Sequence, residues 1–296
     1  MTRLYDLVFA GNVVLDEIHP FSGPVHTFCG GPVQFSAAAA ACSGKRIAVV
    51  TKLAERDAHC LDSMREKGIA VHSSFSQETT YHRVSHPTGN VDERQMVLVR
   101  SAGSFAVRDF AGLEQAPLHL AGLNDQEFTL EFLRQISGEG FAASVDMQCF
   151  VRKVDPRTGE TELSDVEGKE EIAGLCRKVK LDVVEGECLT GTTDIEQAAI
   201  QFETWGAAET MVTRADGVLV RHEGKTYFES FSNKGVQGRT GRGDTTFGAY
   251  LARRLDHGVP ESLRFAAALA SMKMETPGPF GGTLDQVLDR MRTHHL

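Results

Sequence analysis

Short apolar runs alternate with amphipathic stretches along most of the chain, and this pattern predicts its secondary structure. The apolar runs have the length of buried strands, and the stretches between them repeat their hydrophobic residues with helical spacing. Such alternation is typical of an α/β fold with a doubly wound, mostly parallel sheet. The predicted strands are residues 4–14, 46–51, 118–121, 142–147, 181–185 and 209–213, followed by a hairpin over 217–222 and 225–231. The predicted helices are residues 32–43, 56–67, 125–136, 167–179, 194–205, 244–256, 260–275 and 283–293.

Two segments depart from this alternation. Residues 16–29 and 81–107 contain strand-like pieces and turn residues instead of helices. We expect them to form a small β-rich lid over the carboxyl ends of the main strands, where ligands of open α/β sheets bind. The main domain would then comprise residues 1–15, 30–80 and 108–296.

The composition is that of an ordinary globular protein and argues against several kinds of partner. The chain has 296 residues, of which 41% are hydrophobic, and a net charge of −9. This acidic balance argues against a nucleic-acid partner that is held through its phosphates. No run of 18 apolar residues occurs, so we expect no membrane partner, and the first ten residues are typical of a strand and not of a secretion signal.

The use of cysteine indicates a cytoplasmic protein. The six cysteines are scattered and form no Cys-x-x-Cys pair. Because disulfide frameworks belong to small secreted domains, we expect six free thiols in a reducing cytoplasm.

A glycine-rich loop runs directly into a predicted helix, with the sequence Gly238-Arg239-Thr240-Gly241-Arg242-Gly243-Asp244. The first N–H groups of a helix have no partner within it, and glycines let the backbone approach a ligand closely. The loop therefore predicts an anion site. Its spacing is neither that of a Walker A loop nor that of the Gly-x-Gly-x-x-Gly motif of dinucleotide-binding proteins.

Asp244 gives this loop a catalytic interpretation. A carboxylate repels a bound phosphate unless it faces the other reactant. At the start of the helix it is placed to accept a proton from a substrate hydroxyl, while the neighbouring N–H groups stabilise the transferring phosphoryl group. The alternative is that Asp244 only caps the helix, which is a common role of aspartate.

The sequence Thr-Gly-Arg-Gly-Asp-Thr at positions 240–245 resembles the Thr-Gly-Ala-Gly-Asp-Thr signature of the ribokinase-like (PfkB) carbohydrate kinases. The resemblance implies an ATP-dependent kinase in which this loop is the anion hole and its aspartate is the catalytic base. By resemblance, those roles pass to Gly241, Arg242, Gly243 and Asp244. Arg242 replaces a residue that is usually small, and it either adds a cation to the phosphate site or points into solvent.

The N-terminal part resembles the substrate-binding half of the same family. Gly30 and Gly31 open an Ala-rich helix as the family's Gly-Gly signature does, and the segment from Asn12 to Asp16 resembles its first strand. Without the resemblance, the glycines are equally typical of a tight turn. The substrate residues that the resemblance implies are Asn12, Asp16, Gly30, Gly31, Gln34 and Asp244. Phe35 stands where family members that bind sugars or nucleosides carry Asn, which argues against a ribose- or fructose-like substrate.

A metal site is implied by the segment Asp182-Val183-Val184-Glu185, which resembles the family's Asn-x-x-Glu motif. In that motif the Glu orders a magnesium ion and its waters. Mg²⁺ prefers oxygen ligands and keeps several waters, so one or two carboxylates are enough. We therefore expect Mg²⁺ near Glu185 and Asp182, with Glu187 as the alternative acid.

The nucleotide site implied by the resemblance combines strand ends with the glycine-rich loop. Arg152 follows a central strand at a position suited to a bidentate contact with phosphate, although an ordinary surface role is the alternative. The residues implied are Thr213, Ala215, Gly217, Thr240, Gly241, Gly243 and Arg152.

Together these features predict transfer of the γ-phosphoryl group of ATP to a hydroxyl of a small sugar or polyol, with a slight preference for a cyclic polyol such as inositol. The alternatives are a nucleoside kinase, a kinase of a vitamin-like aromatic alcohol that stacks on Phe35, and a non-catalytic metabolite-binding protein of the same fold. We also expect a homodimer, because the exposed edge of a lid is often covered by a second lid.

Overall fold

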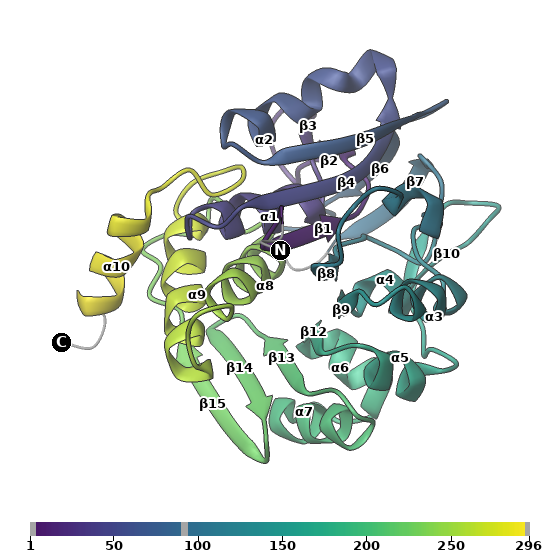
Figure 1. Cartoon of the computed structure of the whole chain (residues 1–296). Coiled ribbons are helices and arrows are strands. Elements are labelled where there is room, and N and C mark those ends of the chain that lie inside the picture. Colours follow the sequence, from purple (N-terminus) through teal and green to yellow (C-terminus); the bar gives the residue numbers. More distant parts are fainter. Residues whose placement is uncertain (1–3, 90–93, 294–296) are drawn as a thin grey trace.

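The computed structural model describes residues 4–89 and 94–293, and its centre is a nine-stranded sheet (Figure 1). The strand order is β15-β14-β13-β12-β9-β8-β1-β4-β5. Neighbouring strands from β13 to β5 run parallel, whereas β14 and β15 are antiparallel additions at one edge. The doubly wound, mostly parallel α/β fold is thereby confirmed. The strands are β1 Leu7–Ala10, β4 Ile47–Ala54, β5 Ala70–Ser76, β8 Pro117–Leu120, β9 Ala142–Asp146, β12 Lys178–Asp182, β13 Glu209–Thr213, β14 Gly217–His222 and β15 Lys225–Ser230.

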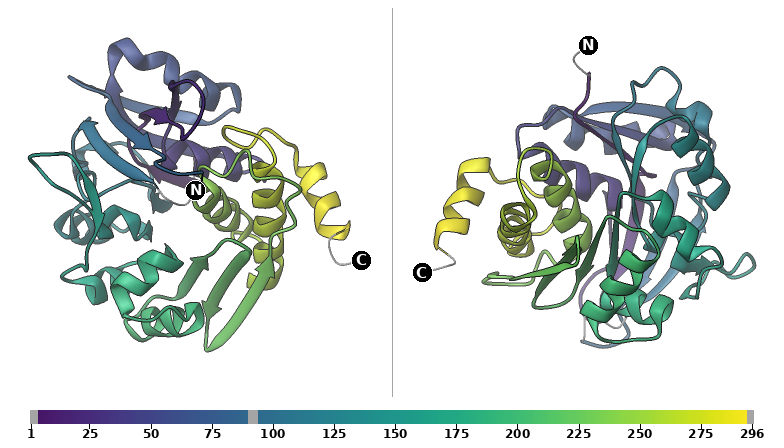
Figure 2. Two further views of the ribbon diagram at one scale, coloured as in Figure 1. Left: turned by 180° about the vertical axis from the view of Figure 1, so that it is seen from behind. Right: turned by 60° about the horizontal axis from the view of Figure 1, so that its bottom comes forward.

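Helices cover both faces of this sheet (Figures 1 and 2). Side chains along β1 point alternately to the two faces, so each face contributes to a separate core. Leu7 and Phe9 pack into a core with α1, α8 and α9, whereas Val8 and Ala10 pack into a second core with α3, α5 and α7. A strand that is buried on both faces is apolar throughout, as a parallel sheet requires. The helices are α1 Pro32–Ala41, α2 Asp62–Glu66, α3 Leu130–Gly138, α4 Gln148–Val151, α5 Lys169–Leu175, α6 Val183–Thr190, α7 Ile195–Thr204, α8 Arg242–Arg253, α9 Val259–Met274 and α10 Leu284–Thr293, with 3-10 turns η1 Glu55–Leu61 and η2 Val107–Phe110.

Four further strands form a separate sheet in the order β3-β2-β6-β7, called the small sheet below. Its strands are β2 Val14–His19, β3 His26–Gly30, β6 Thr80–Ser85 and β7 Gln95–Arg100. The outer edge of β7 meets a hairpin of β10 (Arg152–Val154) and β11 (Thr161–Leu163), because the Leu98 N–H donates to the Gly159 carbonyl at 2.8 Å. One edge of the small sheet is therefore covered within the chain. The division into a main domain and a lid stays a prediction.

Several element boundaries differ from the prediction for physical reasons. The helix predicted over 167–179 ends at Leu175, and β12 begins at Lys178, three residues before the predicted strand. Lys180 made this strand hard to recognise, since a buried lysine is rare unless it is paired. Strand β5 was not predicted because its sequence, AVHSSFS, mixes polar and apolar residues at the edge of the sheet.

The expectation of six free thiols is wrong. Cys29 and Cys60 form a disulfide, with 5.4 Å between their Cα atoms. The sequence gives no sign of this pair, since the two residues meet only through the packing of β3 against η1. The free cysteines are Cys42, Cys149, Cys176 and Cys188.

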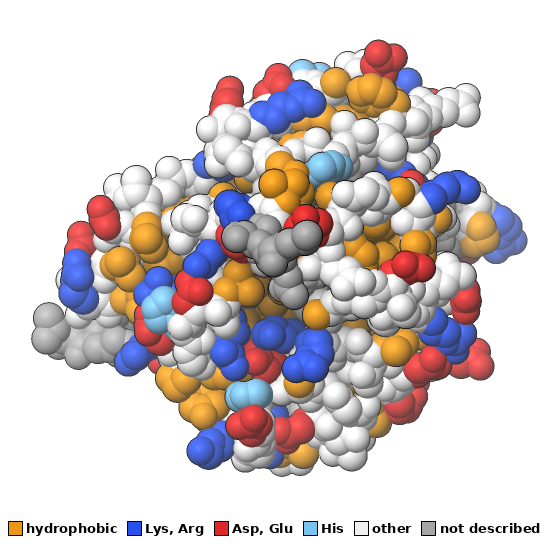
Figure 3. All heavy atoms as spheres, in the orientation of Figure 1, with side chains coloured by type: hydrophobic (Ala, Val, Ile, Leu, Met, Phe, Trp, Pro, Cys, Tyr) orange, Lys and Arg blue, Asp and Glu red, His pale blue; other side chains and the backbone are white. Residues whose placement is uncertain are grey.

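The surface of the described residues carries charges of both signs. Acidic and basic side chains are interspersed on the face shown in Figure 3. None of the helices in residues 4–89 and 94–293 has both the length and the apolar character that a membrane span requires.

Candidate active site

The glycine-rich loop and the first turn of α8 form a backbone anion site. Gly241 caps the helix with a φ of 75°, and the first helical hydrogen bond ends on its carbonyl. The N–H groups of Gly243 and Asp244 come before that bond in the helix, so they have no acceptor within it. The N–H of Arg242 instead donates to the Arg239 carbonyl at 3.1 Å. The predicted anion hole therefore has its donors at Gly243 and Asp244.

The buried side chains of Phe35 and Lys273 contact this loop and hold it in position. A Cβ atom at Gly241 would lie 2.5 Å from Cδ1 of Phe35. Lys273, on α9, donates hydrogen bonds to the carbonyls of Gly238 and Thr240, and its Nζ lies 4.8 Å from the centroid of the Phe35 ring. Burial lowers the pKa of Lys273 to about 8, against the opposing effect of the Asp244 charge. Phe35 is 2% exposed and supports the loop, so it does not offer a stacking surface to a substrate.

The Asp244 carboxylate is oriented by a neutral neighbour. Gln148 donates from Nε2 to Asp244 Oδ1 at 3.2 Å and to the Gly122 carbonyl at 2.9 Å. The Ser36 hydroxyl donates to the backbone carbonyl of Asp244 at 3.1 Å, which connects α1 with α8. Because Gln148 is uncharged, its hydrogen bond orients the carboxylate without forming an ion pair. Gln148 was not among the predicted site residues.

Some of the buried polar side-chain atoms without a hydrogen-bond partner belong to residues at or beside the predicted substrate positions. Among the described residues, Asn12 Oδ1, Gln34 Oε1 and His82 Nδ1 have none. The other ends of two of these side chains are held in place, since Asn12 Nδ2 donates to the Gly103 carbonyl at 3.0 Å and Gln34 Nε2 donates to Ser63 Oγ at 2.5 Å. A buried polar atom that lacks a partner costs free energy. A ligand hydroxyl group, which both donates and accepts, is a suitable partner for each of these atoms.

Asp16 and His82 are paired positions on the neighbouring strands β2 and β6, and both are buried. Burial raises the pKa of Asp16 to about 7, with Arg94 opposing the shift and Asp244 adding to it. Burial also lowers the pKa of His82 to about 4, and the charge of Arg152 adds to this effect. His82 was not among the predicted site residues. Its signal was a polar residue at an inward position of an alternating strand.

The two glycines predicted to line the substrate site pack its components together. Gly31 caps α1 with a φ of 106°, and a Cβ there would lie 3.0 Å from the Asn12 carbonyl oxygen. A Cβ at Gly30 would lie 3.1 Å from Asp16 Oδ2. The structure thus brings together the predicted substrate residues Asn12, Asp16, Gly30, Gly31 and Gln34.

A network of buried ion pairs lies at the carboxyl ends of β9 and β12. Lys180 Nζ is 2.8 Å from Asp146 Oδ2 and 4.0 Å from Glu185 Oε2, and Arg152 donates to Glu185 Oε1 at 2.9 Å. Asp182 and Glu185 also form a capping box at the start of α6, because each carboxylate accepts the other's backbone N–H at 2.8 and 2.9 Å. Both oxygens of Glu185 are therefore engaged.

This arrangement limits how a magnesium ion would bind. Burial alone would lower the pKa of Lys180, but Asp146 and Glu185 raise it above its ordinary value, so the lysine is a fixed cation. Since Glu185 accepts bonds at both oxygens, it is poorly placed for direct ligation. Mg²⁺ commonly keeps several of its waters. Asp182 and Glu185 therefore fit an ion held through water.

Positive charges gather around the start of α8. Desolvation and the charge of Arg152 lower the pKa of Arg94, although the residue is exposed and the carboxylates of Asp182, Glu185 and Asp244 oppose the shift. Burial, Arg239 and Arg94 lower the pKa of Arg242 to about 10, although Asp182 opposes the shift. Such mutual effects arise because the guanidinium groups lie close together. Carboxylates of Asp182, Glu185, Asp216 and Asp244 act on the same arginines and balance part of their charge. Arg239 and Arg242 beside the loop favour an anionic ligand there.

The remaining predicted nucleotide residues differ in their relation to the loop. Thr213 is buried at the end of β13, and its Oγ1 lies 3.7 Å from the position of a Cβ at Gly243. Ala215 is exposed in the following turn. Gly217 lies under Phe228, whose Cζ would be 2.5 Å from a Cβ at this position. Thr213 therefore borders the anion site, whereas Gly217 is required for packing.

The chain matches the model of the pfkB family carbohydrate kinases over residues 11–284. Among curated proteins, none matches the sequence. A solved structure of a pyrophosphate-dependent kinase in the ribokinase family, complexed with a pyrophosphate analog and myo-inositol, is 28% identical, with a TM-score of 0.87 over 96% of this chain and 99% of that chain. A sulfate complex of a pyrophosphate-dependent kinase in the ribokinase family is 29% identical, with a TM-score of 0.88 and the same coverage. Ribokinase of Arabidopsis thaliana, complexed with ribose and ATP, is 18% identical, with a TM-score of 0.77 over 97% of this chain and 99% of that chain, and this likeness shows the fold alone.

Proposed function

Because the chain belongs to the pfkB family of carbohydrate kinases, we propose that it transfers a phosphoryl group from pyrophosphate to a hydroxyl of a cyclic polyol of the inositol type. The family makes the enzyme a phosphotransferase with an alcohol acceptor, and the identities of donor and acceptor are the proposal. The observation that carries it is that Arg239 and Arg242 flank Gly241 in the glycine-rich loop, whereas Asn12, Asp16 and Gln34, on the predicted substrate side, are buried polar residues.

The positive charge of the arginines beside the loop favours pyrophosphate as the phosphoryl donor. Pyrophosphate has no base or ribose, so its binding energy must come from contacts to phosphate oxygens, which arginine makes in bidentate form. The charge of Arg242 is influenced by Arg239 and Arg94, and the charge of Arg94 is influenced by Arg152. Two structures of pyrophosphate-dependent kinases are also 28% and 29% identical to this chain. ATP, which the sequence resemblance implies, is the second candidate, because the ribokinase complexed with ATP shares the fold.

Buried polar atoms that lack a hydrogen-bond partner favour a polyol as the acceptor. Asn12, Gln34 and His82 each present one buried atom without a partner, and Asp16 adds a buried carboxyl group. A ring that carries a hydroxyl on every carbon offers donors and acceptors in several directions. A vitamin-like aromatic alcohol is no longer favoured, because Phe35 lies beneath the loop.

The proposed reaction places the acceptor hydroxyl between Asp244 and the donor phosphorus. As the bond from the acceptor oxygen to phosphorus forms and the bridging P–O bond of the donor breaks, the Asp244 carboxylate takes the hydroxyl proton. Gln148 holds that carboxylate in orientation. The N–H groups of Gly243 and Asp244 donate to the transferring group, and the arginines balance the charge of the departing phosphate.

Two further features complete the proposed mechanism. The small sheet acts as a lid that excludes water, which would otherwise compete with the polyol as acceptor. Mg²⁺, held through water by Asp182 and Glu185, would supply positive charge to the donor oxygens when bound.

The test is a comparison of donors. Initial rates of myo-inositol phosphorylation are measured with pyrophosphate and with ATP for the wild type, Arg242→Met and Arg264→Met. Arg264 is the matched control because it is exposed on α9. We expect faster turnover with pyrophosphate and a KM for pyrophosphate that Arg242→Met raises roughly 10- to 100-fold, as expected for the loss of a charge-assisted hydrogen bond. The control should be unchanged.

The other outcomes separate the parts of the proposal. Turnover with ATP and none with pyrophosphate would make ATP the donor and leave the kinase assignment in place. Turnover with other polyols or sugars and none with inositol would replace the acceptor. If neither donor supports turnover with any polyol, sugar or nucleoside tested, the proposed reaction is wrong.

A further inference from the structure

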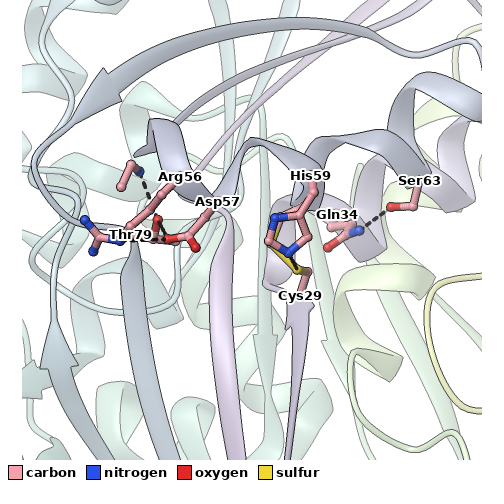
Figure 4. The surroundings of a disulfide bond; sticks show 9 residues. Cys29, Gln34, Arg56, Asp57, His59, Ser63 and Thr79 are labelled. Atoms are coloured by element: carbon pink, nitrogen blue, oxygen red, sulfur yellow. Dashed lines mark hydrogen bonds and ion pairs between the residues drawn. A yellow bond between two sulfur atoms is a disulfide. The ribbon is translucent and has the colours of Figure 1, made fainter.

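The disulfide connects the small sheet to the main sheet beside the proposed acceptor pocket (Figure 4). Cys29 lies on β3, directly before Gly30 and Gly31, where the chain passes from the small sheet into α1. Cys60 lies on η1, which follows β4 of the main sheet. The cross-link therefore joins the small sheet to η1 next to the point where β3 leads into α1.

The same turn, η1, also contacts the segment directly before β6, where the chain enters the small sheet for the second time. Asp57 accepts a hydrogen bond from the Thr79 hydroxyl at 2.5 Å, one residue before β6 begins. Arg56 pairs with Glu78 at 2.5 Å and donates to the Gln77 carbonyl at 3.1 Å. Figure 4 shows Thr79 beside Asp57 and, further along the same turn, the disulfide with His59. Thus η1 anchors both β3 and β6, and only the β3 anchor is covalent.

We propose that Cys29 and Cys60 form a redox modification site, in which dithiol–disulfide exchange with a small-molecule disulfide fastens β3 to η1 and thereby sets the mobility of the small sheet. This inference goes beyond the proposed phosphoryl transfer and does not depend on the identity of its donor or acceptor.

The exposure of the two cysteines and the position of His59 favour reversible exchange. Cys29 is half-buried, whereas Cys60 is 2% exposed, so an incoming thiolate reaches the Cys29 sulfur. The attack forms a mixed disulfide at Cys29, breaks the Cys29–Cys60 bond and releases Cys60 as a thiolate. His59 is exposed, and its Nε2 lies 3.8 Å from both sulfurs, so it is placed to protonate the departing thiolate.

The exchange balances with a dithiol reagent. A second thiol of the same reagent attacks the mixed disulfide, which releases Cys29 as a thiol and leaves the reagent oxidised. Two thiols of the reagent thus become one disulfide while the protein disulfide becomes two thiols. The reverse sequence forms the Cys29–Cys60 disulfide again.

Formation of the disulfide would affect the proposed acceptor site through residues that lie next to Cys29 and Cys60. Gly30 touches Asp16, and Gln34 on α1 donates to Ser63 on α2, directly after η1. In the reduced protein, β3 keeps its pairing with β2 and its contact with α1 but loses its covalent link to η1, while the β6 anchor at Asp57 remains. We therefore expect reduction to free the β3 end of the small sheet and to leave the β6 end held.

The test compares the full chain equilibrated with oxidised and with reduced dithiothreitol. Free thiols are counted in denaturant, the cross-linked peptide is identified by mass, and hydrogen exchange is followed over residues 26–31 and 77–82. We expect four free thiols in the oxidised protein and six in the reduced one, with exchange over 26–31 at least tenfold slower when oxidised and little change over 77–82. Cys60→Ser should abolish this response, and Cys42→Ser, at a half-buried free cysteine, should keep it.

Several results would overturn the proposal. One is six free thiols after oxidation, and another is a cross-link that forms without any change in exchange over 26–31. A third is a reduced wild type that retains one equivalent of added zinc which Cys60→Ser does not bind, because the cluster of Cys29, His59 and Cys60 would then be a metal site. The reduced wild type gives the comparison even if a variant fails to fold, and none of these readings depends on kinase activity.

Discussion

Replacing Gly241 by alanine tests how the anion loop is held. Gly241 has a φ of 75°, and a Cβ there would meet the ring of Phe35 at 2.5 Å. The left-handed conformation alone costs a non-glycine residue roughly 1–2 kcal/mol. Forcing a methyl group against a buried ring adds about 1–3 kcal/mol. We therefore expect Gly241→Ala to lower the free energy of unfolding by roughly 2–5 kcal/mol.

The matched control for the backbone cost is Gly44→Ala. Gly44 has the same φ of 75°, and nothing lies within 4 Å of a Cβ at that position. Its substitution should cost only the roughly 1–2 kcal/mol of the left-handed conformation. The difference between the two variants isolates the contact with Phe35. Adding Phe35→Leu to Gly241→Ala should recover part of that difference by making room for the methyl group.

The assay combines urea unfolding with steady-state kinetics. Because Gly241 sets the position of the Gly243 and Asp244 N–H groups, a shift of the loop by about 1 Å should lower kcat roughly a hundredfold. Gly44→Ala, at a turn outside the site, should leave kcat unchanged. The reasoning is refuted if both variants lose the same stability, or if Gly241→Ala keeps full activity while it loses stability.

Four further predictions follow from the structure. Asp16, whose pKa is raised to about 7, favours the folded state below the ordinary pKa of aspartate, and this contribution is lost as the pH rises through about 7. In urea unfolding, Asp16→Asn should therefore be more stable than the wild type by roughly 2–4 kcal/mol at pH 8 and should differ little from it near pH 4. The same variant should bind the acceptor more weakly. Arg152→Met removes the cation closest to the buried Glu185 and leaves Lys180 at 4.0 Å as its remaining charged partner, so it should lose about 3–5 kcal/mol, and a loss below about 1 kcal/mol in the same assay would contradict the buried ion pair. Under oxidising conditions Cys60→Ser should lose roughly 3–4 kcal/mol, since the cross-link spans 31 residues, whereas Cys42→Ser should not, as thermal unfolding will show. Sedimentation equilibrium should detect the predicted homodimer through the free β3 edge of the small sheet, and a monomer at all working concentrations would exclude it.

The fold and the anion site were predictable because their signals are local. Gly241, Gly243 and Asp244 follow one another in the sequence, and a helix start imposes its chemistry on whatever residues stand there. The same is true of the apolar strand β1, whose continuous burial follows from its composition.

The residues that were missed act over long distances in the sequence. Lys273 reaches back to the carbonyls of Gly238 and Thr240 from another helix, and His82 enters the acceptor pocket from a strand that the sequence places in a separate sheet. Nothing local marks the disulfide partners either, which are 31 residues apart. These contacts depend on how α9, β6 and η1 pack, and packing is a property of the whole chain.

The central claim is that Asp244 is the base for phosphoryl transfer to a polyol hydroxyl. The most direct measurement follows, by phosphorus NMR, the conversion of pyrophosphate to a polyol phosphate and orthophosphate by the wild type and by Asp244→Asn, with the folding of both verified. The account predicts that pyrophosphate is consumed only when polyol is present and that the variant is slower by about a thousandfold, the combined value of acid–base catalysis and positioning. An Asp244→Asn variant as fast as the wild type would contradict it.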